Sequence, residues 1–192
     1  SRRDDPVELW NERDVVLITY ADQVRDSGVT PLRAQRRFLL DHRLDEVLRC
    51  VHLLPFCPYT SDDGFSVVDY LEVDPEAGSW DDIAALGESC DLMFDLVLNH
   101  ASQKHQCFQE FLQGDEQYAD FFIDQDPTAD LSQVVRPRSL PLLTPFESSA
   151  GTKHIWTTFS ADQVDLNYAN PRVMLKMLET LVEYARRGAR II

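Results

Sequence analysis

Short apolar runs alternate with helix-like patterns along this chain, and the alternation narrows the folds that it can adopt. Strands are predicted at residues 15–20, 50–54, 92–98 and 189–192. Helices are predicted at residues 32–47, 79–88, 106–113 and 170–188. Continuous apolar strands that alternate with helices predict an α/β fold with a parallel sheet covered by helices. A doubly wound sheet and a β/α barrel both fit this order.

Local signals mark the ends of two of these helices. Ser79 and Asp82 have the spacing of a capping box, which predicts a helix start. Asn170 as the cap and Pro171 as the first helical residue begin the last helix, and Gly188 ends it. The stripe of that helix expected to face the core is Met174, Met177, Leu178, Leu181, Val182 and Ala185.

The segment 124–168 breaks the alternation. It contains four prolines at positions 127, 137, 141 and 145 and little helical pattern, and residues 144–146 and 154–159 are candidates for short strands. Long irregular segments are unusual inside a compact core. We therefore predict an irregular subdomain at 124–168, inserted between an N-terminal part at 1–123 and a helix and strand at 169–192.

Composition disfavours several kinds of function. The chain has 33 acidic and 18 basic residues among 192, so its net charge of −15 argues against binding to nucleic acids or anionic membranes. The start of the chain lacks the apolar segment of a signal peptide. Neither a dinucleotide-binding nor a P-loop motif follows a strand. The four cysteines form no C-x-x-C pair, which predicts reduced thiols in a cytoplasmic protein.

Polar residues follow the predicted strands, and they lie in motifs that resemble a known family. DLVLNH at 95–100 resembles the first signature region of the α-amylase superfamily, glycoside hydrolase family 13. SDDGF at 61–65 resembles the sugar-binding loop of its sucrose phosphorylase branch. Further matches to that branch are GSWDDI at 78–83, RPR at 136–138, WTTF at 156–159 and QVDL at 163–166. Longer runs look closest to the members that act on glucosylglycerate, at 15–22, 52–56, 61–70, 136–146 and 156–169.

The resemblance implies a (β/α)8 barrel enzyme that moves glucose from an α-glucoside to inorganic phosphate with retention, giving α-glucose 1-phosphate. Such chemistry uses two carboxyl groups about 5–5.5 Å apart. The resemblance places both beyond Ile192, so we assign no catalytic carboxylate within the chain. Because a (β/α)8 barrel takes about 250 residues or more, we expect an N-terminal part with strands 1–3 and the start of strand 4, inactive alone. No metal or cofactor is implied.

The same resemblance assigns substrate-binding residues. It implies that Asp62 binds the glucosyl hydroxyls and that His100 supports the transition state at the same sugar unit. Phe65 and Phe159 are expected to be aromatic walls. Asp95 and Asn99 are expected to be structural residues beside the site. Gln163 is a further substrate-binding candidate, and Arg136 and Arg138 are candidates for capturing the phosphate or an acceptor carboxylate, because guanidinium groups suit oxyanions.

Each assignment has a plainer alternative. Asp62 also fits a turn residue, and the Asp62–Asp63 doublet permits a slip of one position. His100 also fits a core histidine, the two phenylalanines fit core packing and the two arginines fit solvated residues. Other glucosides remain open: the enzyme is alternatively a sucrose or glucosylglycerol phosphorylase or an amylase-type α-glucosidase. A non-catalytic sugar-binding module is the alternative of a different class. The sequence does not indicate an oligomeric state.

Overall fold

A four-stranded parallel sheet forms one end of the molecule. The computed structural model describes residues 11–12, 14–135, 139 and 141–192. The strands are β1 (Val16–Thr19), β2 (Cys50–Leu53), β3 (Asp91–Phe94) and β8 (Ala189–Ile191), and they lie in that order, each parallel to the next. The order follows the chain, as in the wall of a barrel, whereas a doubly wound sheet reverses its order at a switch point. The sheet is part of a (β/α)8 barrel, which confirms the predicted fold.

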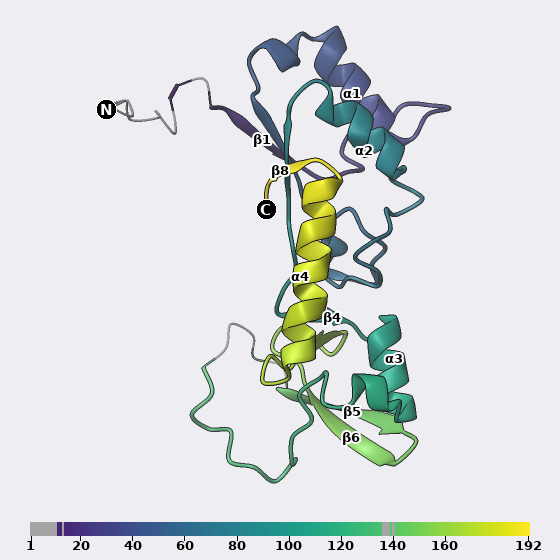
Figure 1. The fold of residues 1–192 in the computed structure, drawn as a ribbon, viewed down its shortest axis with the longest axis vertical. Coiled ribbons are helices and arrows are strands. Elements are labelled where there is room, and N and C mark those ends of the chain that lie inside the picture. Colours follow the sequence, from purple (N-terminus) through teal and green to yellow (C-terminus); the bar gives the residue numbers. More distant parts are fainter. Residues whose placement is uncertain (1–10, 13, 136–138, 140) are drawn as a thin grey trace, which may run out of the picture.

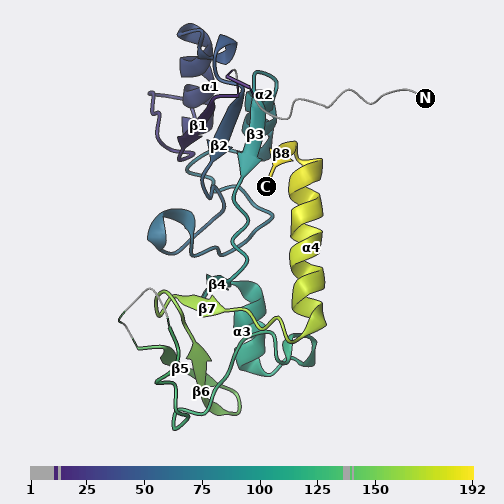
Figure 2. The ribbon, with the colours of Figure 1, turned by 90° about the vertical axis from the view of Figure 1, so that its left-hand side faces the viewer.

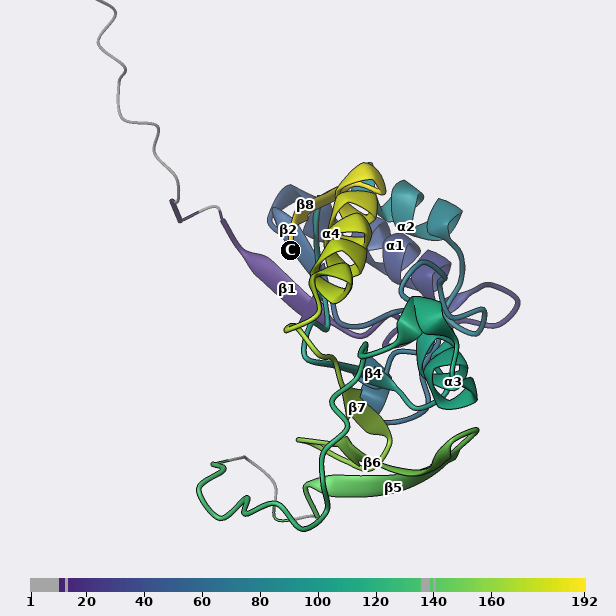
Figure 3. The ribbon, with the colours of Figure 1, turned by 60° about the horizontal axis from the view of Figure 1, so that its bottom comes forward.

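Three helices cover one side of this sheet. They are α1 (Pro31–Asp41), α2 (Trp80–Gly87) and α4 (Pro171–Arg186), and Figure 3 shows them on the same side of the strands. Val51 and Leu53 of β2 are fully buried in one core with Leu32 of α1 and Ile83 of α2. Burial of such side chains is the main force that holds the helices on the sheet.

The predicted caps of α2 and α4 are confirmed. The Ser79 hydroxyl accepts a hydrogen bond from the Asp82 amide at 3.3 Å, and the Ser79 amide donates to the Asp82 carboxylate at 3.0 Å. The side chain of Asn170 accepts from the amide of Arg172 at 3.0 Å. These bonds satisfy amide groups that have no partner within the first turn of a helix.

Two predicted elements end earlier than expected. The helix predicted over 32–47 stops at Asp41, because Arg43 has a left-handed backbone (φ 54°), and a 3-10 turn, η1 (Leu44–Glu46), follows. The strand predicted over 92–98 stops at Phe94. Beyond it the Tyr70 hydroxyl donates to the carbonyls of Val97 and His100, at 3.1 and 2.8 Å. A run of apolar residues does not show at which residue a helix or a β-strand ends.

The predicted core stripe of α4 is wrong at five of its six residues. Met177 is buried, whereas the other five are exposed, Leu178 by 45%. The buried residues of the helix are Val173, Met177, Thr180 and Tyr184. Two neighbouring faces of α4 are apolar, and periodicity alone does not say which of them meets the sheet. The contacts of Tyr184 identify the face that meets the sheet. Its ring packs on Phe94 with the ring centroids 5.8 Å apart, and its hydroxyl is hydrogen-bonded to the thiol of Cys57.

The other end of the molecule holds short antiparallel strands and a helix. β5 (Leu143–Ser148) and β6 (Gly151–Trp156) form a hairpin, and β4 (His100–Ser102) pairs with β7 (Gln163–Asp165). Figure 2 shows β4 and β7 between the parallel sheet and this hairpin, and Figure 1 shows α4 spanning the distance between the two ends. The remaining elements are η2 (Asp62–Gly64), α3 (Gln106–Gln113) and η3 (Glu116–Tyr118).

Packing in this region crosses the boundary predicted between residues 123 and 124. The ring of Phe108 on α3 contacts Phe122 and Phe146 with centroid distances of 4.9 Å each. Helix α3 therefore packs on the hairpin rather than on the parallel sheet, and the subdomain limits stay a prediction. No helix among the described residues is long and apolar enough to cross a membrane.

Gln35 of α1 provides a test of this packing. Its side chain is 1% exposed, and within the described residues neither its amide nitrogen nor its oxygen has a hydrogen-bond partner. An unpaired buried polar group costs about 1–3 kcal/mol. We expect Gln35→Met, which keeps the length of the side chain, to raise the free energy of unfolding in urea by about 1 kcal/mol. Gln106→Met, at an exposed position of α3, is the control, and a loss of stability confined to Gln35→Met would contradict the prediction.

Candidate active site

Five of the predicted substrate-binding residues lie together beyond the carboxyl ends of the parallel strands. Nε2 of His100, the first residue of β4, donates to the Phe65 carbonyl at 2.9 Å. The His100 ring lies against the Phe159 ring with centroids 5.1 Å apart. The Gln163 amide donates to the Asp62 carboxylate at 2.9 Å. The bond between Gln163 and Asp62 connects residues 101 positions apart in the chain. In a barrel this end of the strands holds the active site.

An unusual backbone presents the Asp62 side chain. Asp62, Asp63 and Gly64 all have left-handed backbones, with φ of 57°, 50° and 101°. Aspartate adopts this conformation more readily than most residues, because its short side chain bonds locally. Asp62 is exposed, and among the described residues only Gln163 bonds to its carboxylate. The carboxylate therefore keeps acceptor capacity for a ligand.

His100 is buried and neutral. Burial lowers its pKa, and this outweighs the Phe65 carbonyl and the Asp165 and Asp62 charges, which favour the protonated ring. Because the proton of the neutral ring is on Nε2, facing a carbonyl, Nδ1 is an acceptor. The side-chain amide nitrogen of Asn99 lies 3.5 Å from Nδ1.

Two carboxylates lie near the site, of which the sequence predicted one and not the other. Asp95, predicted to be structural, pairs with Nε2 of His52 at 2.8 Å. Asp165 was not expected at the site: it is 5% exposed, lies opposite His100 in the β4–β7 pair and accepts bonds from Thr158. Burial raises the pKa of Asp165. Only the antiparallel pairing brings Asp165 beside His100, and no spacing in the sequence indicates that pairing.

The structure does not describe the two arginines that were predicted to bind an anion. Arg136 and Arg138 lie outside the described residues. Lys153, the cation nearest to them in the chain that is described, forms an ion pair with Asp124 at 2.8 Å and lies over the ring of Phe111. The described part of the chain has no group of three or more His, Cys, Asp or Glu side chains suited to a metal ion.

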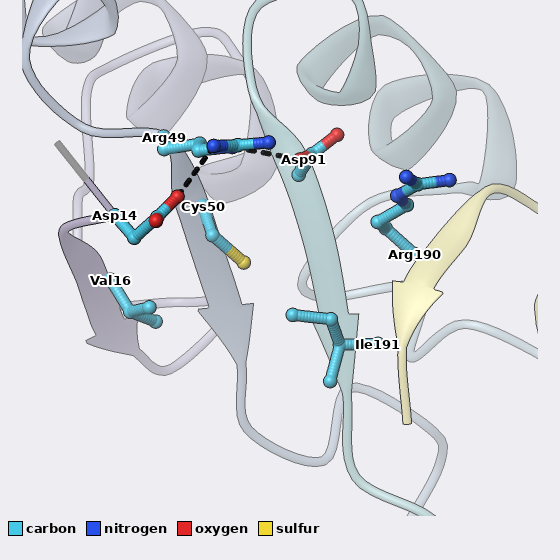
Figure 4. Close-up of a pocket in the computed structure, with 7 residues that line it drawn as sticks. All are labelled: Asp14, Val16, Arg49, Cys50, Asp91, Arg190 and Ile191. Carbon is cyan, nitrogen blue, oxygen red and sulfur yellow. Dashed lines mark hydrogen bonds and ion pairs between the residues drawn. The ribbon is translucent and has the colours of Figure 1, made fainter. Parts of the chain in front are cut away.

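A separate cavity of about 170 Å³ lies at the opposite ends of the parallel strands, where they begin. Figure 4 shows Arg49 between Asp14 and Asp91, with ion-pair distances of 2.5 and 3.7 Å. Cys50 and Arg190 also line the cavity. Charge pairs at this end of a barrel serve stability, whereas the chemistry of such folds is built at the other end. We therefore place the candidate site around Asp62 and His100.

Comparison with known proteins finds a matching family model and similar curated proteins. The model of the alpha amylase catalytic domain family matches residues 47–191. A glucosylglycerate phosphorylase of Allomeiothermus silvanus is 56% identical over 95% of this chain and 33% of its own length. The glucosylglycerate phosphorylase of Escherichia coli is 52% identical over 95% of this chain and 33% of its own. A sucrose phosphorylase of Agrobacterium vitis is 35% identical over 90% of this chain and 37% of its own.

Solved structures show the same likeness. The crystal structure of sucrose 6F-phosphate phosphorylase from Thermoanaerobacter thermosaccharolyticum superimposes with a TM-score of 0.83 and 29% identity. The match covers 95% of this chain and 39% of that one. The chain thus spans about a third of the length of the curated relatives that it matches.

Proposed function

This chain belongs to the alpha amylase catalytic domain family, and on that premise we propose that the full-length protein carrying it is a retaining α-glucosyl phosphorylase. Glucosylglycerate is the proposed glucosyl donor, and inorganic phosphate is the acceptor. The observation that carries the proposal is a difference in sequence identity between two groups of relatives. Glucosylglycerate phosphorylases are 52–56% identical to this chain, whereas a sucrose and a glucosylglycerol phosphorylase are 35% and 38% identical.

The site geometry supports binding of a glucosyl unit. The Asp62 carboxylate accepts two sugar hydroxyls while Gln163 fixes its direction. Phe65 and Phe159 offer aromatic surfaces to the apolar C–H face of the sugar. His100 supports the transition state once its Nε2–H exchanges the Phe65 carbonyl for a sugar oxygen. Asp95, held by His52, and Asn99 keep the strand ends in place.

The proposed reaction has two steps on one sugar carbon. A carboxylate attacks the anomeric carbon while a carboxylic acid protonates the departing glycerate oxygen, and phosphate then displaces the enzyme carboxylate to give α-glucose 1-phosphate. Both carboxyl groups are proposed to lie beyond Ile192.

Arg136 and Arg138 remain the proposed anion-binding residues. A cytoplasmic location is also proposed, and it is supported by four cysteines without disulfide bonds.

A substrate panel tests the proposal. The full-length protein is incubated with phosphate and, in turn, glucosylglycerate, sucrose or glucosylglycerol, and release of α-glucose 1-phosphate is measured. We expect kcat/KM for glucosylglycerate to exceed the others at least about tenfold, which corresponds to about 1.4 kcal/mol of transition-state binding. Sucrose as the best substrate would overturn the assigned glucoside. Glucose release at equal rates with and without phosphate would show a hydrolase, and no turnover would favour a binding module.

A further inference from the structure

The loop that carries Asp62 is bonded to one carboxylate of the inserted segment. Oδ2 of Asp162 accepts three hydroxyl hydrogen bonds, from Thr60 at 2.6 Å, Ser61 at 2.5 Å and Ser66 at 2.7 Å. All three donors lie within residues 60–66, which we call the Asp62 loop. Asp162 lies about 100 residues away in the chain, just before β7. One side chain therefore connects both ends of the loop to the subdomain.

The hydroxyl groups around Asp162 form one hydrogen-bonded cluster that ends on its carboxylate. The amide of Lys104 donates to the Ser102 hydroxyl at 3.0 Å, and Ser102 lies 2.6 Å from the Thr60 hydroxyl, which donates to Asp162. Ser66 and Ser102 are fully buried. Because each hydroxyl has one hydrogen, this series is satisfied only if it ends on an acceptor. An ionised carboxylate is the strongest acceptor that a side chain offers.

The charge state of Asp162 agrees with this role. Burial alone would raise its pKa, but the bonds from Ser61, Thr60 and Ser66 outweigh burial and hold the pKa below its usual value. The carbonyl of Asp162 also accepts from the Gln103 amide at 2.8 Å, which fixes its backbone beside β4. The next residue, Gln163, holds the Asp62 carboxylate itself.

The Asp62 loop needs an external support. The left-handed backbones of Asp62 and Asp63 cost free energy and persist only where their surroundings enforce them. We propose that Asp162 is a positioning residue: it holds the Asp62 loop through three hydroxyl groups and thereby sets the position of the Asp62 carboxylate. The kinetic consequence of this proposal rests on the sugar-binding role proposed for Asp62, whereas its structural consequence does not.

Amide hydrogen exchange tests the structural consequence without any substrate. In the full-length protein, Asp162→Ala should speed exchange of the amides of Thr60 and Ser66 about tenfold, because the loop opens locally more often. Asp162→Asn keeps an acceptor oxygen and should stay within about threefold of wild type. Ser61→Ala, which removes one donor, should fall between them. Asp115→Ala is the matched control, since Asp115 accepts a local bond from Gln117 and is remote from the loop.

A double-mutant cycle tests the kinetic consequence. We expect Asp162→Ala to lower kcat/KM for phosphorolysis of glucosylglycerate about tenfold, because small displacements of a binding group are costly. Asp62→Asn is expected to lower it about a hundredfold (see Discussion). If Asp162 acts through Asp62, the double variant loses about a hundredfold rather than a thousandfold. A general structural defect would instead add to the loss.

The outcomes separate the two proposals. Unchanged exchange of the loop amides in Asp162→Ala would overturn the positioning role, whatever substrate the protein uses. A thousandfold loss in the double variant, or an Asp162→Asn as impaired as Asp162→Ala, would overturn it as well. Absence of phosphorolysis in the wild-type protein would overturn the proposed function, while the exchange result would still decide the role of Asp162.

Discussion

Asp62→Asn is expected to lower kcat/KM for phosphorolysis about a hundredfold, whereas Asp63→Asn should leave it within about threefold. Bonds to a charged acceptor are about twice as strong as bonds to a neutral one. Loss of the charge at two sugar hydroxyls therefore removes about 2.7 kcal/mol of transition-state binding. The measurement is steady-state phosphorolysis of glucosylglycerate by the full-length protein.

The two positions form a matched pair. Asp62 and Asp63 are both exposed and have similar backbones, with φ of 57° and 50°. Asparagine tolerates this conformation and alanine does not, so neither variant adds backbone strain. Only Asp62 is bonded to Gln163. A larger loss in Asp63→Asn would show that the sugar-binding residue is the second member of the doublet, and equal small losses would leave Asp62 as a turn residue.

Much of the fold follows from short-range patterns in the sequence. The strands at 16–19 and 50–53 and the helix at 106–113 lie where apolar runs and helical spacing predict them. The caps at Ser79 and Asn170 were predictable because a cap is a local bond between a side chain and a nearby amide. Each of these features depends on residues within about four positions, and sequence patterns report such features well.

Features that depend on distant contacts were not predictable in this way. The turn at Arg43 and the face of α4 that meets Phe94 are decided by tertiary packing. The candidate site itself was predicted by family resemblance, which named Asp62, His100 and Gln163 separately. The contact of Gln163 with Asp62, and the support of the loop by Asp162, require a pairing across about 100 residues. No local spacing encodes that pairing, so the structure adds it.

Gly64→Ala is expected to destabilise the protein by about 3 kcal/mol and to lower kcat/KM about a hundredfold. Gly64 has φ of 101°, and an added Cβ would lie 2.7 Å from the carbonyl oxygen of Pro55 and 3.0 Å from its Cβ. The neighbour is backbone and a rigid ring at the end of β2, so the Asp62 loop must move instead. A shift of about 1 Å at a binding group is enough for a hundredfold loss.

A second glycine separates strain from displacement. Gly188 has φ of 103°, and an added Cβ there meets nothing within 4 Å. Gly188→Ala therefore carries the same backbone penalty, about 1 kcal/mol, without the collision. The difference of about 2 kcal/mol in urea unfolding between the two variants measures the contact with Pro55. If both variants lose the same stability and Gly64→Ala keeps its kcat/KM, the position of the Asp62 loop does not depend on its approach to Pro55. A selective loss in Gly64→Ala instead means that the end of β2 fixes the loop together with the hydroxyl bonds to Asp162.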